Sequence, residues 1–359
     1  MAKSPLVPVF DGHNDTLLHL ALKSPGTEED FLTGREGHID LPKARAGGLA
    51  GGLFAMFTPS KKWTKEIRWR ETGPKGPRES KGWTVPMAGR VSQPAALNAV
   101  MAMMASLLRV EKLSRGGVKV VRTHRQLTSA MDRGVLAAVM HIEGVEAIRK
   151  DLDALGVLYE TGLRSLGPVW SRPNAFGHGV PFNFPDSPDM GPGLTSAGKD
   201  LVRVCNDLGI LVDLSHLNEK GFWDVVGLSK APIVASHSGA WELCRSPRNL
   251  TDDQLLAIGE SGGIVGVNFA RAFLRKDGRD RRTTVNEIAR HVEYIAEKIG
   301  IDHVGLGSDF DGTKVPQDMK DASGLPLLME ALKERGIKGT KLKKVAHGNW
   351  LRVLKETWR

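Results

Sequence analysis

The sequence predicts an α/β fold of the (β/α)₈ type, a TIM barrel, because eight apolar, β-rich runs alternate with amphipathic stretches along the chain. The runs are 6–10, 52–57, 136–141, 162–170, 210–214, 233–236, 263–268 and 304–307. Runs that are so continuously apolar are buried on both faces, as parallel strands beneath a helical layer are. Eight strand and helix units are the number that closes such a sheet into a barrel.

The stretches between the runs carry apolar residues at spacings of three and four, which indicates helices. They are 95–115, 150–161, 196–208, 219–228, 251–260 and 284–299. Residues that favour helix ends agree with these limits. Thr195, Ser196 and Thr251 stand where helices should begin, and Gly209 and Gly300 stand just past helix ends.

A doubly wound sheet would show the same alternation of strands and helices. It would gather functional side chains at one switch point near the middle of the sheet. In this chain His or carboxylate residues follow the first, third, fifth and sixth runs. Because only a closed ring brings those four strand ends together, we favour the barrel.

The length of 359 residues suits one barrel with insertions, although length alone would also suit two ordinary domains. We expect a single domain over 1–359, with a basic insertion over 58–92 after the second strand. This insertion has nine basic and three acidic residues, and three tryptophans stand among its Gly and Pro residues. That composition is typical of a long functional loop. We therefore expect no nucleic-acid partner, despite a net charge of +9.

The two cysteines, Cys205 and Cys244, lack C-x-x-C spacing and are more typical of buried thiols than of a disulfide or a metal site. The first residues lack the long apolar core of a signal peptide, and no run reaches 18 apolar residues. The last residues are charged, unlike a lipid-anchor signal. We therefore expect a cytoplasmic protein without membrane attachment.

Five side chains of metal-ligand type stand at or just beyond the ends of the runs. They are His13, Asp15, Glu143, His216 and His237. Each motif is weak by itself, because an H-x-D pair or a histidine at a strand end is more often a hydrogen-bonded structural residue. Their coincidence on one rim of a barrel indicates a metal centre.

Three imidazoles and two carboxylates exceed what a single catalytic zinc takes from a protein. Two ions about 3.5 Å apart would use the set fully. We expect His13 and Asp15 on one ion, His216 and His237 on the other, and Glu143 bridging both. Nitrogen and oxygen donors without thiolate suit two zinc ions, with manganese or cobalt as alternatives.

A Gly-rich stretch over 305–312 follows the eighth run and places Asp309 at the same rim. A metal pair would activate a water molecule near neutral pH. The Asp309 carboxylate would take the proton of this water and pass it to the leaving amine. For Asp311 we favour a structural role, as a turn or helix N-cap residue. The residues thus predict a metal-dependent hydrolase.

Together these residues resemble the membrane (renal) dipeptidases, a dizinc family of amidohydrolase-like barrels. The resemblance spans nearly the whole chain and rests on the order and spacing of DGHND, HIEG, VDLSH, HSGA, RSPRN, GSDFDG and GNWLRV. It implies the same five metal ligands, Asp309 as the acidic residue, and a homodimer. It also implies that Arg248, eleven residues after His237, binds the C-terminal carboxylate of a dipeptide, which suits a guanidinium group.

The sequence departs from this family after the fourth predicted strand. Members related to the animal enzyme carry a histidine there that is thought to help polarise the scissile carbonyl, whereas Trp170 takes its place here. Stabilisation of the oxyanion is then left to the metal pair, Arg172, Asn174 or His178. This stretch resembles a bacterial subgroup, so the substrate preferences of the animal enzyme are not carried over.

We therefore expect a metal-dependent dipeptidase, and whether it accepts a D-residue at the C-terminal position stays open. Two other classes also stay open. One is a barrel hydrolase that acts on N-acyl amino acids, lactones or phosphoesters, and the other is a non-catalytic binder that uses the basic segment. Since the barrel supports many chemistries, only the site can decide between them.

Overall fold

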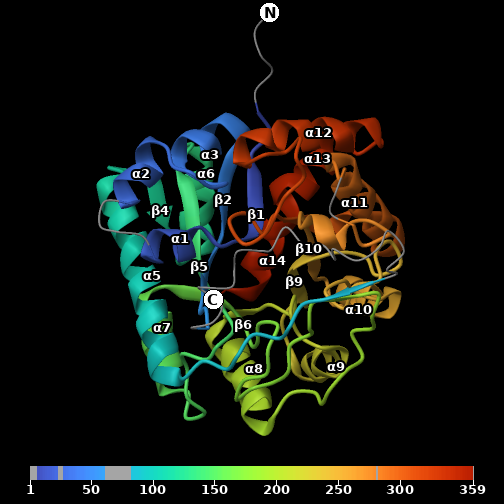
Figure 1. Cartoon of the computed structure of the whole chain (residues 1–359). Helices are drawn as coiled ribbons and strands as arrows, with labels where there is room; N and C mark the ends of the chain where they lie inside the picture. The colour runs from blue at the N-terminus through green and yellow to red at the C-terminus, as the bar shows by residue number, and fades with distance from the viewer. Residues whose placement is uncertain (1–5, 23–26, 61–81, 280–281, 359) are drawn as a thin grey trace, which may run out of the picture.

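The computed structural model describes residues 6–22, 27–60, 82–279 and 282–358, and within these ranges eight parallel strands form a ring (Figure 1). They are β1 (Val9–Asn14), β2 (Leu49–Phe57), β5 (Leu136–Glu143), β6 (Leu163–Gly167), β8 (Leu211–Val212), β9 (Val234–Ser238), β10 (Ile264–Asn268) and β11 (Val304–Gly307). Hydrogen-bonded ladders join them in the order β8-β6-β5-β2-β1-β11-β10-β9. A single parallel bridge between Asp213 and Val234 completes the ring. The predicted (β/α)₈ fold is confirmed.

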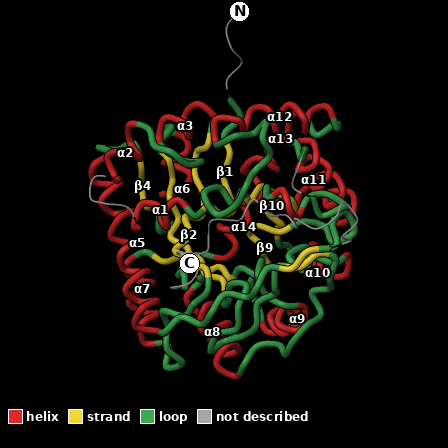
Figure 2. Tube along the Cα trace, in the orientation of Figure 1, coloured by secondary structure: helices red, strands yellow, loops and turns green. Residues whose placement is uncertain are grey.

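Helices cover the outside of the ring (Figures 1 and 2). The described helices are α1 (Thr16–Leu22), α2 (Thr27–Thr33), α3 (Leu41–Gly47), α5 (Gln93–Leu113), α6 (His124–Asp132), α7 (Asp153–Thr161), α8 (Ser196–Leu208), α9 (Glu219–Leu228), α10 (Asp252–Glu260), α11 (Val285–Ile299), α12 (Leu325–Glu334), α13 (Gly339–Lys343) and α14 (Asn349–Thr357). Predicted caps are in place. The Thr195 side chain accepts a hydrogen bond from the Gly198 N–H, Thr251 forms a capping box with Gln254, and Gly209 is left-handed.

The first strand differs from its prediction, because β1 continues through the polar residues 11–14. Asp11, His13 and Asn14 are all buried. Prediction from an apolar pattern ends a strand at the last apolar residue. It therefore misses the end of a strand whose last residues are polar and buried. The short strands β3 (Trp83–Thr84), β4 (Val118–Val120) and β7 (Asn183–Phe184) were not predicted either, since so few residues show no periodicity.

The described ranges contain only part of the predicted insertion over 58–92. Residues 61–81 lie outside the described ranges. The part that follows contains β3, which pairs antiparallel with β7. The extent and role of the insertion stay predictions.

The core has an outer and an inner part, and the alternation along β5 separates them. One set of β5 side chains joins the large cluster beneath the helices, namely Leu136, Ala138, Met140 and Ile142. Ala137 and Val139 belong to a smaller cluster that gathers residues from six ring strands, so this cluster fills the ring. His141 and Glu143 continue the inner side and therefore point into the ring at its carboxyl end.

Helix α14 closes the amino end of the ring with Trp350. This side chain is fully buried, and its indole N–H donates to the carbonyl of Leu306 at 2.9 Å. Three ring positions have no room for a side chain beside the indole, and all three are glycines: Gly12, Gly266 and Gly305. The ring is therefore packed at one end and polar at the other.

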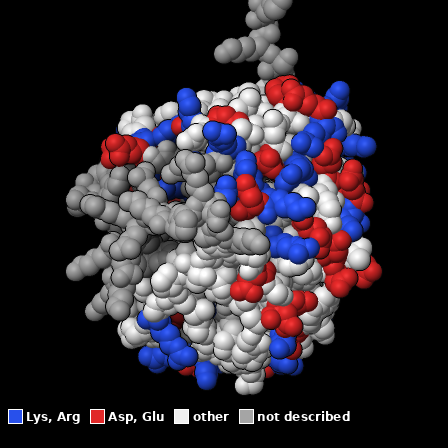
Figure 3. Space-filling model, turned by 45° about the vertical axis from the view of Figure 1, so that its right-hand side comes forward, with Lys and Arg blue, Asp and Glu red and all other residues white. Residues whose placement is uncertain are grey.

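The surface carries charges of both signs. On the face shown in Figure 3, Lys and Arg alternate with Asp and Glu. Exposed ion pairs of the described residues include Lys298 with Asp252 and Lys333 with Glu330. Among the helices in the described ranges, none combines the length and the apolar run that crossing a bilayer requires.

Replacing Trp350 by Ala should destabilise the protein by about 3–5 kcal/mol, because it leaves a cavity where the indole fills the amino end of the ring. The free energy of unfolding, measured in denaturant, tests this expectation. Trp223→Ala is the matched control, since Trp223 on α9 is 39% exposed and should cost much less. Equal unfolding midpoints for the Trp350 variant and the unchanged protein would contradict the role given to α14.

Candidate metal centre

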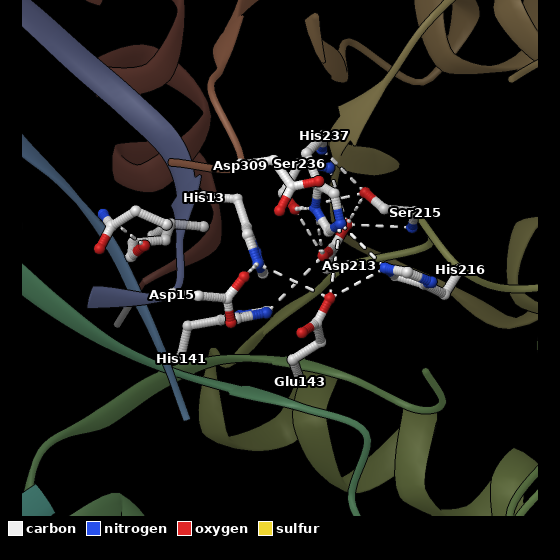
Figure 4. A network of polar contacts seen from close by, with 12 residues as sticks. His13, Asp15, His141, Glu143, Asp213, Ser215, His216, Ser236, His237 and Asp309 are labelled. Carbon is white, nitrogen blue, oxygen red and sulfur yellow. Dashed lines mark hydrogen bonds and ion pairs between the residues drawn. The ribbon is translucent and has the colours of Figure 1, made fainter. Parts of the chain in front are cut away.

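The five candidate ligands converge at the carboxyl end of the ring (Figure 4). His13, Glu143 and His237 lie at the ends of β1, β5 and β9, while Asp15 and His216 follow β1 and β8. None of the five is more than 6% exposed. Residues that are up to 224 positions apart, His13 and His237, thus share one buried site because parallel strands end at a common rim.

The Glu143 carboxylate lies at the centre of the cluster. Its Oε1 atom is 2.9 Å from Nε2 of His216, 3.4 Å from Nε2 of His237 and 3.6 Å from Nε2 of His13. Nε2 of His13 is also 3.5 Å from Oδ2 of Asp15. One carboxylate therefore faces both halves of the predicted ligand set.

The possible ligand atoms of the described residues form three overlapping groups, each compact enough for one cation. Glu143, His216 and His237 make up the first group. His13, Asp15 and Asp309 make up the second, and within each group the atoms lie no more than 4.8 Å apart. A third group, His13, Asp213 and His237, takes one histidine from each of the halves expected from the sequence.

Unpaired buried atoms test whether the site fits a metal. Both ring nitrogens of His13 and Oδ1 of Asp15 are buried and have no hydrogen-bond partner among the described residues. An unpaired buried polar group costs about 1–3 kcal/mol. The two Nε2 atoms of His216 and His237 also face each other at 3.0 Å. Metal cations bound between these nitrogen and oxygen atoms would give each of them a partner. The residues therefore fit a metal centre with nitrogen and oxygen ligands.

Burial and charge set the protonation of the histidines. Burial lowers the pKa of His216 and of His237 well below the ordinary value, and the positive groups of Arg248 and His13 lower it further. Both rings are therefore neutral, which is the form that binds metal. Burial also lowers the pKa of His13, but the carboxylates of Glu143, Asp15 and Asp309 outweigh it and raise the pKa to about 10.

Asp309 follows β11 in a left-handed conformation, with φ 57°. Its carboxylate accepts a hydrogen bond from Nδ2 of Asn268 at 3.1 Å. Burial and the neighbouring Asp15 raise its pKa to about 7. A side chain at Gly312 would collide with the carboxylates of Asp15 and Asp309, so glycine is required where the loop passes them. A carboxyl group with this pKa suits proton transfer near neutral pH.

Asp311 lies in a turn, as expected, and is buried in an ion pair that the sequence did not reveal. Its Oδ2 accepts hydrogen bonds from Nη1 of Arg35 at 2.8 Å and from Oγ1 of Thr16 at 3.0 Å. The backbone N–H of His38 donates to Oδ1 at 2.6 Å. These contacts fix the loop that carries Asp309.

Arg248 lies on the loop after β9 and is 2% exposed. Its guanidinium group donates to the carbonyls of Ser215 and His237, while its Nε has no partner in the described part of the chain. Burial lowers its pKa to about 10, although Asp309, Glu143 and Asp213 act to raise it. The group stays positive at neutral pH and is held beside the metal centre.

The aromatic ring of Trp170 stands next to the site, with its centroid 5.8 Å from that of His216. Of the three residues considered for the oxyanion, Asn174 is used within its own loop, where it binds the carbonyl of Pro168 and the N–H of Phe176. Arg172 pairs with Glu146 at 2.6 Å but keeps a buried Nη1 without a partner in the described ranges. Nδ1 of His178 is likewise unpaired there.

Sequence reasoning missed the polar residues that support the ligands. Hydroxyl groups of Ser171 and Ser236 lie 2.8 Å from Nδ1 of His216 and of His237, respectively. Asp213 is buried and accepts a hydrogen bond from the Ser236 hydroxyl, and its signal in the sequence was a carboxylate inside the apolar run of VDLSH.

Comparison with known proteins finds one matching family model and several similar proteins. The family model described as membrane dipeptidase (peptidase family M19) matches residues 4–358. An uncharacterized protein in the pqqA 5' region of Klebsiella pneumoniae is 47% identical over 247 residues, which is 68% of this chain and 91% of that protein.

Two solved structures resemble the whole chain. A metallo peptidase from Rhodobacter sphaeroides, liganded with a phosphinate mimic of the dipeptide L-Ala-D-Ala, has a TM-score of 0.94 and 46% identity, and the match covers 99% of this chain and 100% of that one. Dipeptidase AC, a metallo peptidase of family M19, has a TM-score of 0.90 and 45% identity, with 99% of both chains covered.

Metal uptake should release a proton from His13. Because the pKa of His13 is raised to about 10, its ring is protonated at neutral pH, and a ligating imidazole must first lose that proton. Zinc affinity should therefore rise with pH up to about 10. Calorimetric titration of metal-free protein in buffers of different ionisation enthalpy measures the released proton. His13→Asn is the control that has no such proton, and an affinity that stays constant from pH 6 to pH 9 would contradict the assignment.

Proposed function

Since the chain belongs to the membrane dipeptidase family, peptidase family M19, and is a metal-dependent dipeptidase, we propose that the cluster around Glu143 is its active site. One observation carries the proposal. Ligand-type side chains from three other strand ends are buried around the Glu143 carboxylate, and several atoms of the ligand set lack hydrogen-bond partners in the described part of the chain. Such a site lies where barrel enzymes hold their catalytic groups.

The proposed centre takes two metal ions, zinc or alternatively manganese or cobalt. His13 and Asp15 hold one ion, His216 and His237 hold the other, and Glu143 is shared. When bound, such a pair polarises the scissile carbonyl and lowers the pKa of a water molecule. The compact grouping of Glu143 with His216 and His237, and the neutral rings of these two histidines, support this division.

Asp309 is the proposed proton carrier. Its carboxylate lies beside the His13 and Asp15 half of the site, and Asn268 orients it. With a pKa of about 7 it can both accept a proton and donate one near neutral pH. It accepts the proton of the attacking water and delivers it to the leaving amine of the dipeptide.

Arg248 is proposed to bind the C-terminal carboxylate of the substrate, while the free amine lies near the carboxylates of the metal ligands. Contacts at both ends confine cleavage to dipeptides, because a longer chain would displace one of them. The ligand of the Rhodobacter sphaeroides structure mimics L-Ala-D-Ala. We propose that this chain also accepts a D-residue at the C-terminal position.

Other sequence-based expectations stay predictions. They are the homodimer, the cytoplasmic location, the lack of membrane or nucleic-acid partners, and the single domain over 1–359 with its insertion over 58–92. None of them enters the argument for the site.

Asp309→Asn should lower kcat by about 10²–10⁴-fold, because the amide cannot carry the proton. Hydrolysis of L,L and L,D dipeptides by the purified, metal-loaded protein measures this loss. Asp302→Asn is a surface control, since the exposed Asp302 carboxylate pairs with Lys344 at the opposite end of β11, and it should keep full activity. Unchanged kcat in the Asp309 variant would remove the mechanism. Faster turnover of N-acyl amino acids, lactones or phosphoesters than of dipeptides would remove the substrate class.

Arg248→Lys should raise KM for dipeptides about tenfold or more, because a hydrogen bond to a charged group contributes about 1.5–3 kcal/mol. Dipeptide amides, which lack the terminal carboxylate, serve as matched substrates. The unchanged enzyme should favour the free acid strongly, and the variant should lose most of that preference. An equal preference for the free acid in both proteins would show that another group binds the carboxylate.

A further inference from the structure

A buried carboxylate outside the proposed ligand set lies beneath the metal centre. Asp213 directly follows β8, is 4% exposed, and sits among the ligands in Figure 4. Its Oδ1 accepts hydrogen bonds from the Ser215 N–H at 3.1 Å, the Ser215 hydroxyl at 2.7 Å and the Ser236 N–H at 2.7 Å. Its Oδ2 accepts a hydrogen bond from the Ser236 hydroxyl at 2.6 Å. These four donors fix the carboxylate in one orientation, in which it acts only as an acceptor.

The bond to Ser236 determines which nitrogen of His237 carries hydrogen. A serine hydroxyl has one hydrogen, and an ionised carboxylate can only accept, so the hydrogen of Ser236 points to Asp213. The same oxygen of Ser236 lies 2.8 Å from Nδ1 of His237 and must accept a hydrogen bond from this nitrogen. Nδ1 of His237 therefore carries the ring hydrogen. Nε2, which lies 3.4 Å from Glu143, keeps a free lone pair for a metal.

We infer that Asp213 is a positioning residue, which locks His237 through Ser236 in the tautomer that binds metal and so sets the metal affinity of this half of the centre. The inference rests on the proposed metal site and deepens it. A carboxylate that fixes a ligating histidine is usually a direct hydrogen-bond partner of the ring. Here a serine hydroxyl lies between them, and the Oδ2 to Nδ1 distance is 3.9 Å.

Asp213 also joins the two strands where the ring is weakest. Between β8 and β9 the backbone forms a single bridge, from Asp213 to Val234. The carboxylate accepts from the N–H of Ser236 across this seam, and the Ser215 hydroxyl accepts from the N–H of His237 at 2.9 Å. Ser215 thus contributes to the seam without touching the His237 ring. It offers a control that separates stability of the seam from control of the tautomer.

Asp213→Asn should reverse the tautomer. Two backbone N–H groups donate to the position of Oδ1, so the amide oxygen must stay there and Nδ2 takes the position of Oδ2. Nδ2 then donates to Ser236, whose hydrogen turns to Nδ1 of His237, and the ring hydrogen moves to Nε2. Ser236→Ala removes the relay and leaves Asp213 in place. Ser215→Ala removes one of the four donors to Asp213 and weakens the seam, but it leaves Ser236 in contact with both Asp213 and the His237 ring.

Chelator competition for Zn²⁺, on the full-length, initially metal-free proteins, tests the inference without depending on activity. Asp213→Asn and Ser236→Ala should lose about 10- to 100-fold in zinc affinity. Ser215→Ala should keep the affinity of the unchanged protein while its thermal stability falls. The ¹⁵N resonances of the His237 ring should show hydrogen on Nδ1 in the unchanged protein and on Nε2 in Asp213→Asn.

Dipeptide hydrolysis by Ser236→Ala should recover at saturating zinc, which a collapsed site would not do. If Asp213→Asn does not fold, the Ser236 and Ser215 variants still decide the question. Equal zinc affinity in Ser236→Ala and the unchanged protein overturns the inference, as does an equal loss in Ser215→Ala. If the wild-type protein binds no zinc, the proposed metal centre itself is overturned. This result is distinct from the failure of the role inferred for Asp213.

Discussion

The site depends on the burial of the Glu143 carboxylate among imidazole rings. Removing a carboxylate from water is costly unless cations compensate it, and burial, together with the nearby carboxylates of Asp15 and Asp309, raises the pKa of Glu143 well above its ordinary value. In the metal-free protein the protonated ring of His13 supplies part of that compensation. A metal pair would supply it fully and would at the same time use the neutral rings of His216 and His237. The composition of the site thus follows from one electrostatic requirement.

The barrel satisfies this requirement by keeping its two ends different. At the amino end, Trp350 and apolar residues from the strands fill the ring. At the carboxyl end the inner positions carry His141 and Glu143, and the seam between β8 and β9 is closed by Asp213. The strands therefore hold His13, Glu143 and His237, while the segments that follow β1 and β8 add Asp15 and His216, and the loops after β9 and β11 add Arg248 and Asp309. This arrangement preorganises a site whose ligands are distant in sequence.

Much of this architecture could be predicted from the sequence, because it follows from local patterns. Apolar runs marked all eight strands of the ring, and polar residues at their ends marked His13, Glu143, His216 and His237. The end of β1 could not be predicted, because its last residues are polar and buried. The partners of Asp311 and Asp213 were also hidden. Arg35 and Ser236 become their neighbours only when the ring closes, and a single sequence does not display such contacts.

The most direct test is anomalous diffraction at the zinc edge from crystals of the zinc-loaded protein. The account predicts two peaks about 3.5 Å apart, with Glu143 bridging them, His13 and Asp15 on one ion, and His216 and His237 on the other. A single ion, or two ions that leave Glu143 uncoordinated, would contradict the claim that one shared carboxylate organises the site.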